Sequence, residues 1–259
     1  MTAVLDALPT ADGERLAASL LPGPGSTCVV LAHGFSGSLA KPAVRRIAQA
    51  LTSHASVLAY DARGHGRSTG ATTLGDREVL DVDAAVSAAR ALGFDAVVTC
   101  GWSMGGSTMI RHAALRGERV GGHRLEWVPD AVVSVSATSR WFVRDTAAMR
   151  RLHRVVQTRS GRLYARRVMR TRISPHGWDP LPAAPVECVA AVAPIPLLVV
   201  HGDRDGYFPV SHAVDLAAAA GEPVELWLEE GFAHAESGAS AELVARLGAH
   251  LPVLLGRCS

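Results

Sequence analysis

One glycine-framed turn, residues 101–105 (GWSMG), constrains this 259-residue chain more than any other stretch. An apolar run at 96–98 precedes the turn, and a helix-like run over about 107–116 follows it. This order predicts a buried strand that turns sharply into a helix, with Ser103 exposed at the tip in a strained conformation. Ser103 is therefore a candidate nucleophile. The simpler interpretation is a glycine-rich turn with an incidental serine, because a short motif is only a hypothesis.

The rest of the chain alternates short apolar runs with stretches of helical periodicity. Such alternation is typical of a mostly parallel sheet covered by helices on both faces, and the length suits one large α/β domain. We expect strands at 15–21, 28–32, 56–60, 96–98, 131–136, 196–201 and 224–228. We expect helices from near 41, around 79–89, over 107–116, from 209 and over 239–251.

Residues 138–190 interrupt this alternation. They contain no strand-like apolar run, but Met149, Leu152 and Val155 recur at helical spacing, and a proline-rich segment follows. Long insertions of this kind often serve as lids. We therefore predict a helical cap over 138–190, inserted into a core formed by residues 1–137 and 191–259.

The predicted cap also holds an unusual concentration of positive charge. Residues 138–172 contain eleven arginines and one acidic residue, whereas the formal net charge of the whole chain is only +2. One interpretation is a site for an anionic substrate group, because arginine binds carboxylate and phosphate bidentately. The plainer interpretation is a solvated helix face in a protein whose single lysine is Lys41.

Composition and motifs exclude several other classes of function. No apolar run is long enough to span a bilayer, and the N-terminus lacks the basic and apolar regions of a signal peptide. The cysteines at 28, 100, 188 and 258 form no CxxC pair or metal-ligand spacing. We therefore expect reduced thiols in a cytoplasmic protein. The chemistry expected from the residues described below requires no metal and no organic cofactor. No nucleic-acid-binding motif is present, so a nucleic-acid partner is not expected. The oligomeric state is not readable from the sequence.

A serine nucleophile needs a base within hydrogen-bond reach and an acid that orients the base. Parallel strands end at one edge of the sheet, so these partners should follow later strands. Asp205 follows the run at 196–201, and His234 follows the run at 224–228. Asp203 is a rival acid, but its place nearer the strand suits a residue that holds the turn. Taken singly, Asp205 could be a turn aspartate and His234 a surface histidine.

An oxyanion needs hydrogen-bond donors, and the turn offers the backbone N–H of Met104. A second N–H is expected from Phe35, in the loop after the strand at 28–32, where His33 would brace the loop. The Phe35 ring would also form a wall of the substrate site. The remaining residues expected to contact substrate are Trp102, Trp141 and Phe142.

Together these motifs resemble the α/β-hydrolase superfamily over nearly the whole chain. The segments that carry the resemblance are 33–38 (HGFSGS), 61–68 (DARGHGRS), 101–106 (GWSMGG), 201–209 (HGDRDGYFP) and His234. The resemblance implies an eight-stranded sheet with an antiparallel second strand and a cap inserted after the sixth strand. One departure is Ala233, which stands where many relatives have glycine before the histidine.

The resemblance also implies roles for individual residues. It implies Ser103, Asp205 and His234 as a catalytic triad, with the N–H groups of Phe35 and Met104 as oxyanion donors. The segment at 61–68 is then structural, so its arginine and histidine are not expected to be catalytic.

The expected function is hydrolysis of a small-molecule carboxylic ester or thioester through an acyl-enzyme on Ser103. One alternative is an acyltransferase, cyclase or lyase of the same fold in a biosynthetic pathway. A third interpretation is a non-enzymatic ligand receptor, whose usual mark is a damaged triad. Fold by itself does not choose among these functions.

Overall fold

The computed structural model describes residues 3–257, with side chains described from residue 7. Ten strands are present in this part of the chain. They are β1 (Ala3–Pro9), β2 (Arg15–Leu21), β3 (Thr27–Ala32), β4 (Ser56–Tyr60), β5 (Ala96–Trp102), β6 (Arg119–Val120), β7 (His123–Arg124), β8 (Ala131–Val135), β9 (Leu197–Gly202) and β10 (Val224–Glu229).

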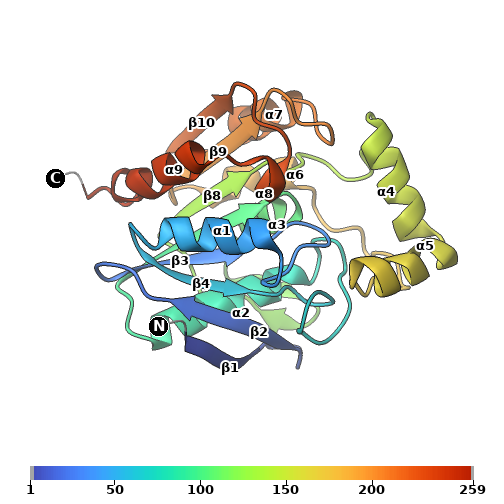
Figure 1. The fold of residues 1–259 in the computed structure, drawn as a ribbon, viewed down its shortest axis with the longest axis horizontal. Helices are drawn as coiled ribbons and strands as arrows, with labels where there is room; N and C mark the ends of the chain where they lie inside the picture. The colour runs from blue at the N-terminus through green and yellow to red at the C-terminus, as the bar shows by residue number, and fades with distance from the viewer. Residues whose placement is uncertain (1–2, 258–259) are drawn as a thin grey trace.

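Eight of these strands form one sheet, in the order β1-β2-β4-β3-β5-β8-β9-β10 (Figure 1). β2 pairs antiparallel with β1 and β4, whereas the pairs from β4 through to β10 are parallel. This arrangement confirms the mostly parallel eight-stranded sheet with an antiparallel second strand. β3 and β5 lie at the centre and are buried on both faces, which explains their continuous apolar sequences.

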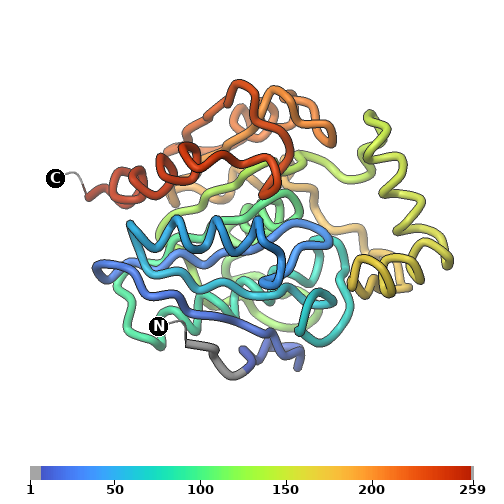
Figure 2. Tube along the Cα trace, viewed as in Figure 1, coloured from blue at the N-terminus to red at the C-terminus, as the bar shows by residue number. Residues whose placement is uncertain are grey.

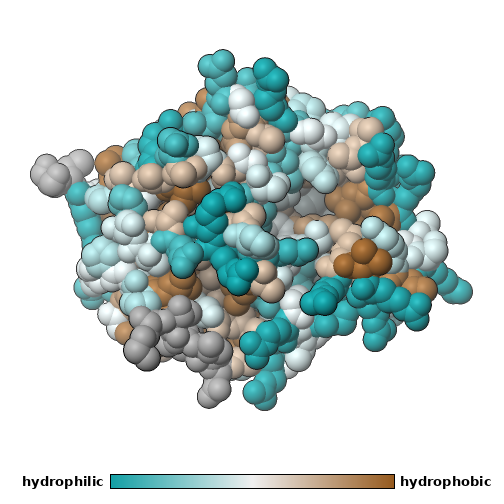
Figure 3. Space-filling view, viewed as in Figure 1, coloured by the Kyte–Doolittle hydropathy of each residue, from teal (hydrophilic) through white to brown (hydrophobic). Residues whose placement is uncertain are grey.

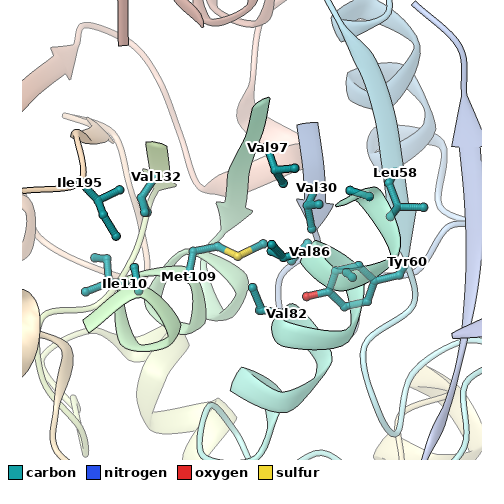
Figure 4. Close-up of a cluster of buried hydrophobic side chains, with 14 of the residues drawn as sticks. Val30, Leu58, Tyr60, Val82, Val86, Val97, Met109, Ile110, Val132 and Ile195 are labelled. Atoms are coloured by element: carbon teal, nitrogen blue, oxygen red, sulfur yellow. The ribbon is translucent and has the colours of Figure 1, made fainter. Parts of the chain in front are cut away.

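Helices cover both faces of the sheet. α1 (Pro42–Leu51), α8 (Ala235–Gly238) and α9 (Ala241–Leu254) pack on one face. α2 (Glu78–Ala91), α3 (Met104–Ala114) and α7 (Ser211–Ala219) pack on the other. In that second layer, Met109 of α3 and Val86 of α2 lie against Val30 and Val97 of the central strands (Figure 4). Across residues 3–257, no helix combines the length and the apolar character needed to cross a bilayer.

Between β8 and β9 the chain leaves the sheet beyond the carboxyl ends of the strands (Figures 1 and 2). It forms α4 (Ala147–Gln157), α5 (Arg159–Tyr164) and a π-helical turn, η1 (Ala165–Met169). α4 begins at a Thr146 cap, whose hydroxyl accepts a hydrogen bond from Met149 N at 3.2 Å. Apolar and polar surface alternate over this outlying region (Figure 3). We call residues 138–174 the cap segment.

The cap segment is attached to the core at both ends. Thr146 Oγ1 donates to Tyr207 O at 3.0 Å, and Thr171 and Ile173 form β-bridges with His65 and Thr72. Further along, α6 (Pro185–Cys188) and η2 (Val189–Val192) pack beside α3 in the core. The predicted boundary at residue 190 therefore falls inside η2, and the division into a core and a cap domain remains a prediction.

The described cysteines are free thiols. Burial raises the pKa of Cys28 and of Cys100 to about 12. Cys188 is half-buried, and burial raises its pKa to about 11. Cys258 lies outside the described residues.

Candidate active site

Ser103 lies at the sharp turn between β5 and α3. Its φ of 52° is positive, a strained conformation for a residue with a side chain, and its N–H donates to Val135 O at 2.8 Å. A Cβ on Gly101 would overlap the Gly105 carbonyl, and a Cβ on Gly105 would lie 2.8 Å from Ala32 O. Gly101 therefore allows the chain to turn this tightly between β5 and α3, and Gly105 allows the start of α3 to lie close to the end of β3.

Three side chains from the ends of three strands meet at this turn. His234 Nε2 lies 2.9 Å from Ser103 Oγ, and His234 Nδ1 lies 2.7 Å from Asp205 Oδ2. Ser103 follows β5, Asp205 follows β9 and His234 follows β10. A serine, a histidine and a carboxylate in this order can activate the hydroxyl as a nucleophile.

Asp205 is held as an ionised carboxylate. Its side chain is 0% exposed, and Oδ1 accepts hydrogen bonds from Tyr207 N at 2.8 Å and Phe208 N at 3.0 Å. Burial alone raises the pKa of Asp205. The bond to His234 and the two backbone N–H groups outweigh burial, so the pKa lies below the usual 3.8. The carboxylate can therefore orient His234 while it remains charged.

Residues that follow β8 and β9 hold the imidazole of His234 and the next residue in place. The Tyr207 ring stacks on the His234 ring with centroids 4.3 Å apart. Ala235, which follows at a φ of 49°, donates its N–H to Ser136 Oγ at 3.1 Å. The rival acid Asp203 instead accepts Gly231 N at 2.7 Å and so holds the turn.

The loop after β3 brings Phe35 beside the serine. A Cβ on Gly34 would lie only 3.0 Å from Ser103 Cβ. Within residues 3–257, no acceptor takes a hydrogen bond from the backbone N–H of Phe35 or of Met104. Both groups are therefore available to an oxyanion.

Buried side chains brace the loop after β3. Ala62 N donates to His33 Nε2 at 3.1 Å, and Ser36 N donates to His65 Nε2 at 3.2 Å. Burial, and then the neighbouring His33, lower the pKa of His65 to about 3, so this ring is a neutral acceptor. Buried Arg63 donates to Asp81 Oδ1 at 2.8 Å and to Asp12 Oδ2 at 2.7 Å. In these contacts Arg63 and His65 act as structural residues of the segment 61–68.

Glu236 is a site residue to which the sequence reasoning assigned no role. Its Oε1 accepts the Gly34 N–H at 2.6 Å, across 202 positions of sequence. It thereby links the loop that presents Phe35 to the loop that presents His234. The only signal in the sequence is an acid two positions after the histidine.

Two adjoining cavities meet at Ser103, which lines both of them. The first, which we call the apolar lobe, has a volume of about 130 Å³. At about 10–15 Å³ for each water-sized position, it holds roughly ten heavy atoms. Its walls are mainly apolar side chains from the loop after β3, α3 and the cap segment, including Phe35, Leu74, Met104, Trp141, Phe142, Val143, Met149, Leu152, Val156, Trp178 and Phe208.

The second cavity contains the histidine, and we call it the histidine lobe. Ser103, Phe35, Met149, Leu152 and Phe208 line both lobes, so the two meet at the serine. The side chains that line the histidine lobe but not the apolar lobe include the polar residues His234, Tyr207, Glu236, Lys41, Arg151 and Tyr164.

Three of the four residues expected to contact substrate, Phe35, Trp141 and Phe142, line the apolar lobe. The prediction for Trp102 is wrong, because its side chain is 0% exposed. Successive side chains of a strand point to opposite faces, and Trp102 packs with Cys100 and Val135 in the core under α1 and α9.

The apolar lobe has walls that the sequence reasoning missed. Trp178 contacts Trp141 with ring centroids 5.1 Å apart and planes tilted by 47°, and it donates its Nε1–H to Thr73 O at 2.6 Å. The apolar residues at helical spacing in α4 were the available signal for another wall of this lobe, since Met149 and Leu152 line it. Within the part of the chain that the structure describes, no group of three or more His, Cys, Asp or Glu residues could hold a metal ion.

Comparison with known proteins agrees with this architecture. The sequence model of the family described as alpha/beta hydrolase fold matches residues 27–123. No curated protein matches the sequence. Among solved structures, an esterase from Pyrococcus furiosus is similar at a TM-score of 0.71 and 20% identity, over 98% of this chain and 92% of that one.

Two further solved structures are similar over nearly their whole length. The protein Est1E from Butyrivibrio proteoclasticus, solved with ferulic acid bound, gives a TM-score of 0.66 at 21% identity, over 96% of this chain and 98% of that one. An esterase domain from a Rhodothermus marinus protein gives a TM-score of 0.63 at 21% identity, over 98% of this chain and 97% of that one. At such identities these similarities establish the fold.

Proposed function

Because this chain has the α/β-hydrolase fold, we propose that it is a serine hydrolase that cleaves carboxylic esters or thioesters through an acyl-enzyme on Ser103. The observation that carries the proposal is the hydrogen-bonded series from Ser103 Oγ to His234 at 2.9 Å and on to Asp205 at 2.7 Å. The unpartnered N–H groups of Phe35 and Met104 supply the oxyanion site. The names of the esterases of similar fold agree with this chemistry.

In the first half of the reaction His234 Nε2 takes the Ser103 proton as the hydroxyl oxygen attacks the substrate carbonyl. The carbonyl electrons move to oxygen, and the oxyanion accepts hydrogen bonds from the N–H groups of Phe35 and Met104. Asp205 stabilises the imidazolium that forms. When the tetrahedral intermediate collapses, the bond to the leaving alcohol or thiol breaks, and that group takes a proton from His234.

In the second half a water molecule replaces the leaving group. His234 removes a proton from the water, and the hydroxide attacks the acyl carbonyl on Ser103. Collapse releases the carboxylic acid and returns the proton to Ser103 Oγ. Every proton transfer uses one imidazole, so the reaction needs no group beyond the side chains and backbone already described.

Hydrolysis of p-nitrophenyl hexanoate tests the proposal, because a hexanoyl group fits the apolar lobe. Ser103→Ala should lower kcat by about 10,000-fold or more with an unchanged circular dichroism spectrum. Analysis of the products in water should find hexanoic acid. Activity retained by Ser103→Ala would exclude the serine mechanism, and acyl transfer to an added alcohol in place of hydrolysis would favour an acyltransferase.

A further inference from the structure

We propose that the leaving group of the substrate bears a phosphate, which binds in a basic groove that continues from the histidine lobe. This inference rests on the proposed function of Ser103, and it extends that function to the chemistry of the substrate. The basic groove is the cavity lined by Arg15, Lys41, Arg67 and Arg170, together with Asp61 and neighbouring backbone.

The position of His234 decides which lobe holds the leaving group. When the carbon–oxygen or carbon–sulfur bond breaks, the leaving atom takes the bonding electron pair and receives the proton from His234 Nε2. The leaving atom must therefore lie on the side of Ser103 where His234 is exposed. His234 lines the histidine lobe and not the apolar lobe. The acyl group consequently occupies the apolar lobe, and the leaving group extends through the histidine lobe.

The histidine lobe opens directly into the basic groove. Gly37, Lys41 and Met169 line both cavities, so a leaving group that passes the beginning of α1 enters the groove. Five exposed cationic side chains lie along this route. They are Lys41 and Arg151 in the histidine lobe and Arg15, Arg67 and Arg170 farther along.

The five cationic side chains lack an acidic partner among the side chains that the structure describes. Among the side chains of residues 7–257, none of the five forms an ion pair. The two acids that line the route are occupied by backbone N–H groups. Asp61 accepts Leu39 N at 2.6 Å and Arg67 N at 2.9 Å, and Glu236 accepts Gly34 N at 2.6 Å.

The apolar lobe has a different electrostatic character. Its one arginine, Arg140, lies 3.3 Å from Asp145 and 3.5 Å from Asp215, so its charge is already partnered. Among the residues that line the two lobes and the groove, the arginines and the lysine without an ion pair therefore lie on the leaving-group side of Ser103. Several unpaired arginines and a lysine around one groove suit phosphate, which offers several oxygens and up to two negative charges.

A phosphate-bearing leaving group could be a thiol or an alcohol, and two matched substrate pairs distinguish these sources. The thiol pair is S-hexanoyl-4′-phosphopantetheine and S-hexanoylpantetheine, which share the thioester and the pantetheine arm and differ only in the phosphate. The alcohol pair is 1-hexanoylglycerol 3-phosphate and 1-hexanoylglycerol. We expect kcat/KM to be at least about tenfold higher for the phosphate-bearing member of one pair, and 0.5 M KCl should remove most of that preference.

Substitution in the groove should reduce the same preference. In the triple variant Lys41→Gln, Arg67→Gln and Arg170→Gln, the preference in kcat/KM for the phosphate-bearing member should fall by about 8–27-fold, at roughly two- to threefold for each exposed cation, or vanish where the wild-type preference is smaller than that. Arg159→Gln is the matched control, because this exposed arginine of the cap segment lines neither lobe nor the groove. It should keep the wild-type ratio.

The outcomes separate this inference from the proposed function. Equal kcat/KM for both members of both pairs would overturn the phosphate inference while leaving Ser103 hydrolysis intact. An unchanged ratio in the triple variant would also overturn it. If no member of either pair and no p-nitrophenyl ester is hydrolysed, the proposed function itself fails.

Discussion

Glu236→Ala should lower the turnover of this protein although Glu236 does not contact the reacting carbonyl in the proposed mechanism. The carboxylate accepts the Gly34 N–H at 2.6 Å, and the next N–H along the loop is that of Phe35. Glu236 is therefore a positioning residue. Without it, the loop loses its link to the His234 loop, and Phe35 N–H is held less firmly at the site of the oxyanion.

The size of the effect follows from the kind of hydrogen bond lost. A hydrogen bond to a charged group contributes about 1.5–3 kcal/mol, and a neutral one about 0.5–1.5 kcal/mol. Glu236 is half-buried beside the histidine lobe, so water can reach Gly34 N–H and the loss should be near the lower bound. About 1.5–2 kcal/mol expressed in the transition state lowers kcat by about 10–30-fold. Glu236→Gln keeps an acceptor oxygen and should lower kcat only about threefold to fivefold.

Steady-state hydrolysis of p-nitrophenyl hexanoate by the wild type, Glu236→Ala and Glu236→Gln measures this effect. The loss should fall on kcat, with KM nearly unchanged, because the oxyanion forms only after binding. Glu230→Ala is the matched control, since Glu230 is an exposed acid in the loop between β10 and His234. An unchanged kcat in Glu236→Ala, or a loss confined to KM, would refute the reasoning.

Three further predictions concern the acid, the apolar lobe and the core. Asp205 has a lower pKa in the folded protein than its ordinary 3.8, so it stabilises the fold above about pH 4, and this contribution is lost as the pH falls through the folded value. In urea titrations, the unfolding free energy of the wild type should decrease between pH 5 and pH 3. Asp205→Asn should show a smaller decrease, and a decrease equal to that of the wild type would contradict this prediction. Leu152→Trp fills the apolar lobe and should shift the preferred p-nitrophenyl ester from hexanoate towards acetate, which kcat/KM over a chain-length series measures. Arg63→Leu leaves Asp81 and Asp12 without their buried cation and should lower the unfolding free energy by about 3–5 kcal/mol.

Most of the sheet was predictable because its strands are buried on both faces. β3, β4 and β5 therefore appear in the sequence as continuous apolar runs. β1 was not predicted, since Asp6 interrupts its apolar residues and Pro9 ends it, as suits an edge strand. β6 and β7 have two residues each and leave no periodic signal.

The candidate site was predictable where it depends on strand ends and not where it depends on side-chain direction. Ser103, Asp205 and His234 each follow a strand of the same sheet, and parallel topology brings such positions to one edge. Trp102 was misplaced because it is next to Ser103 in sequence, whereas its side chain packs in the core under α1 and α9. Glu236 could not be found without the fold, since its partner Gly34 is 202 positions away.

The central claim is that Ser103 is a nucleophile activated by His234, and covalent labelling tests it most directly. The protein is treated with a fluorophosphonate and digested with trypsin, and the peptide spanning residues 91–111 is sequenced by mass spectrometry. We predict one adduct per chain, located on Ser103, and at least a hundredfold slower labelling in His234→Ala. An adduct on another residue of that peptide, such as Ser107, or equal labelling rates in the two proteins, would contradict the proposed mechanism.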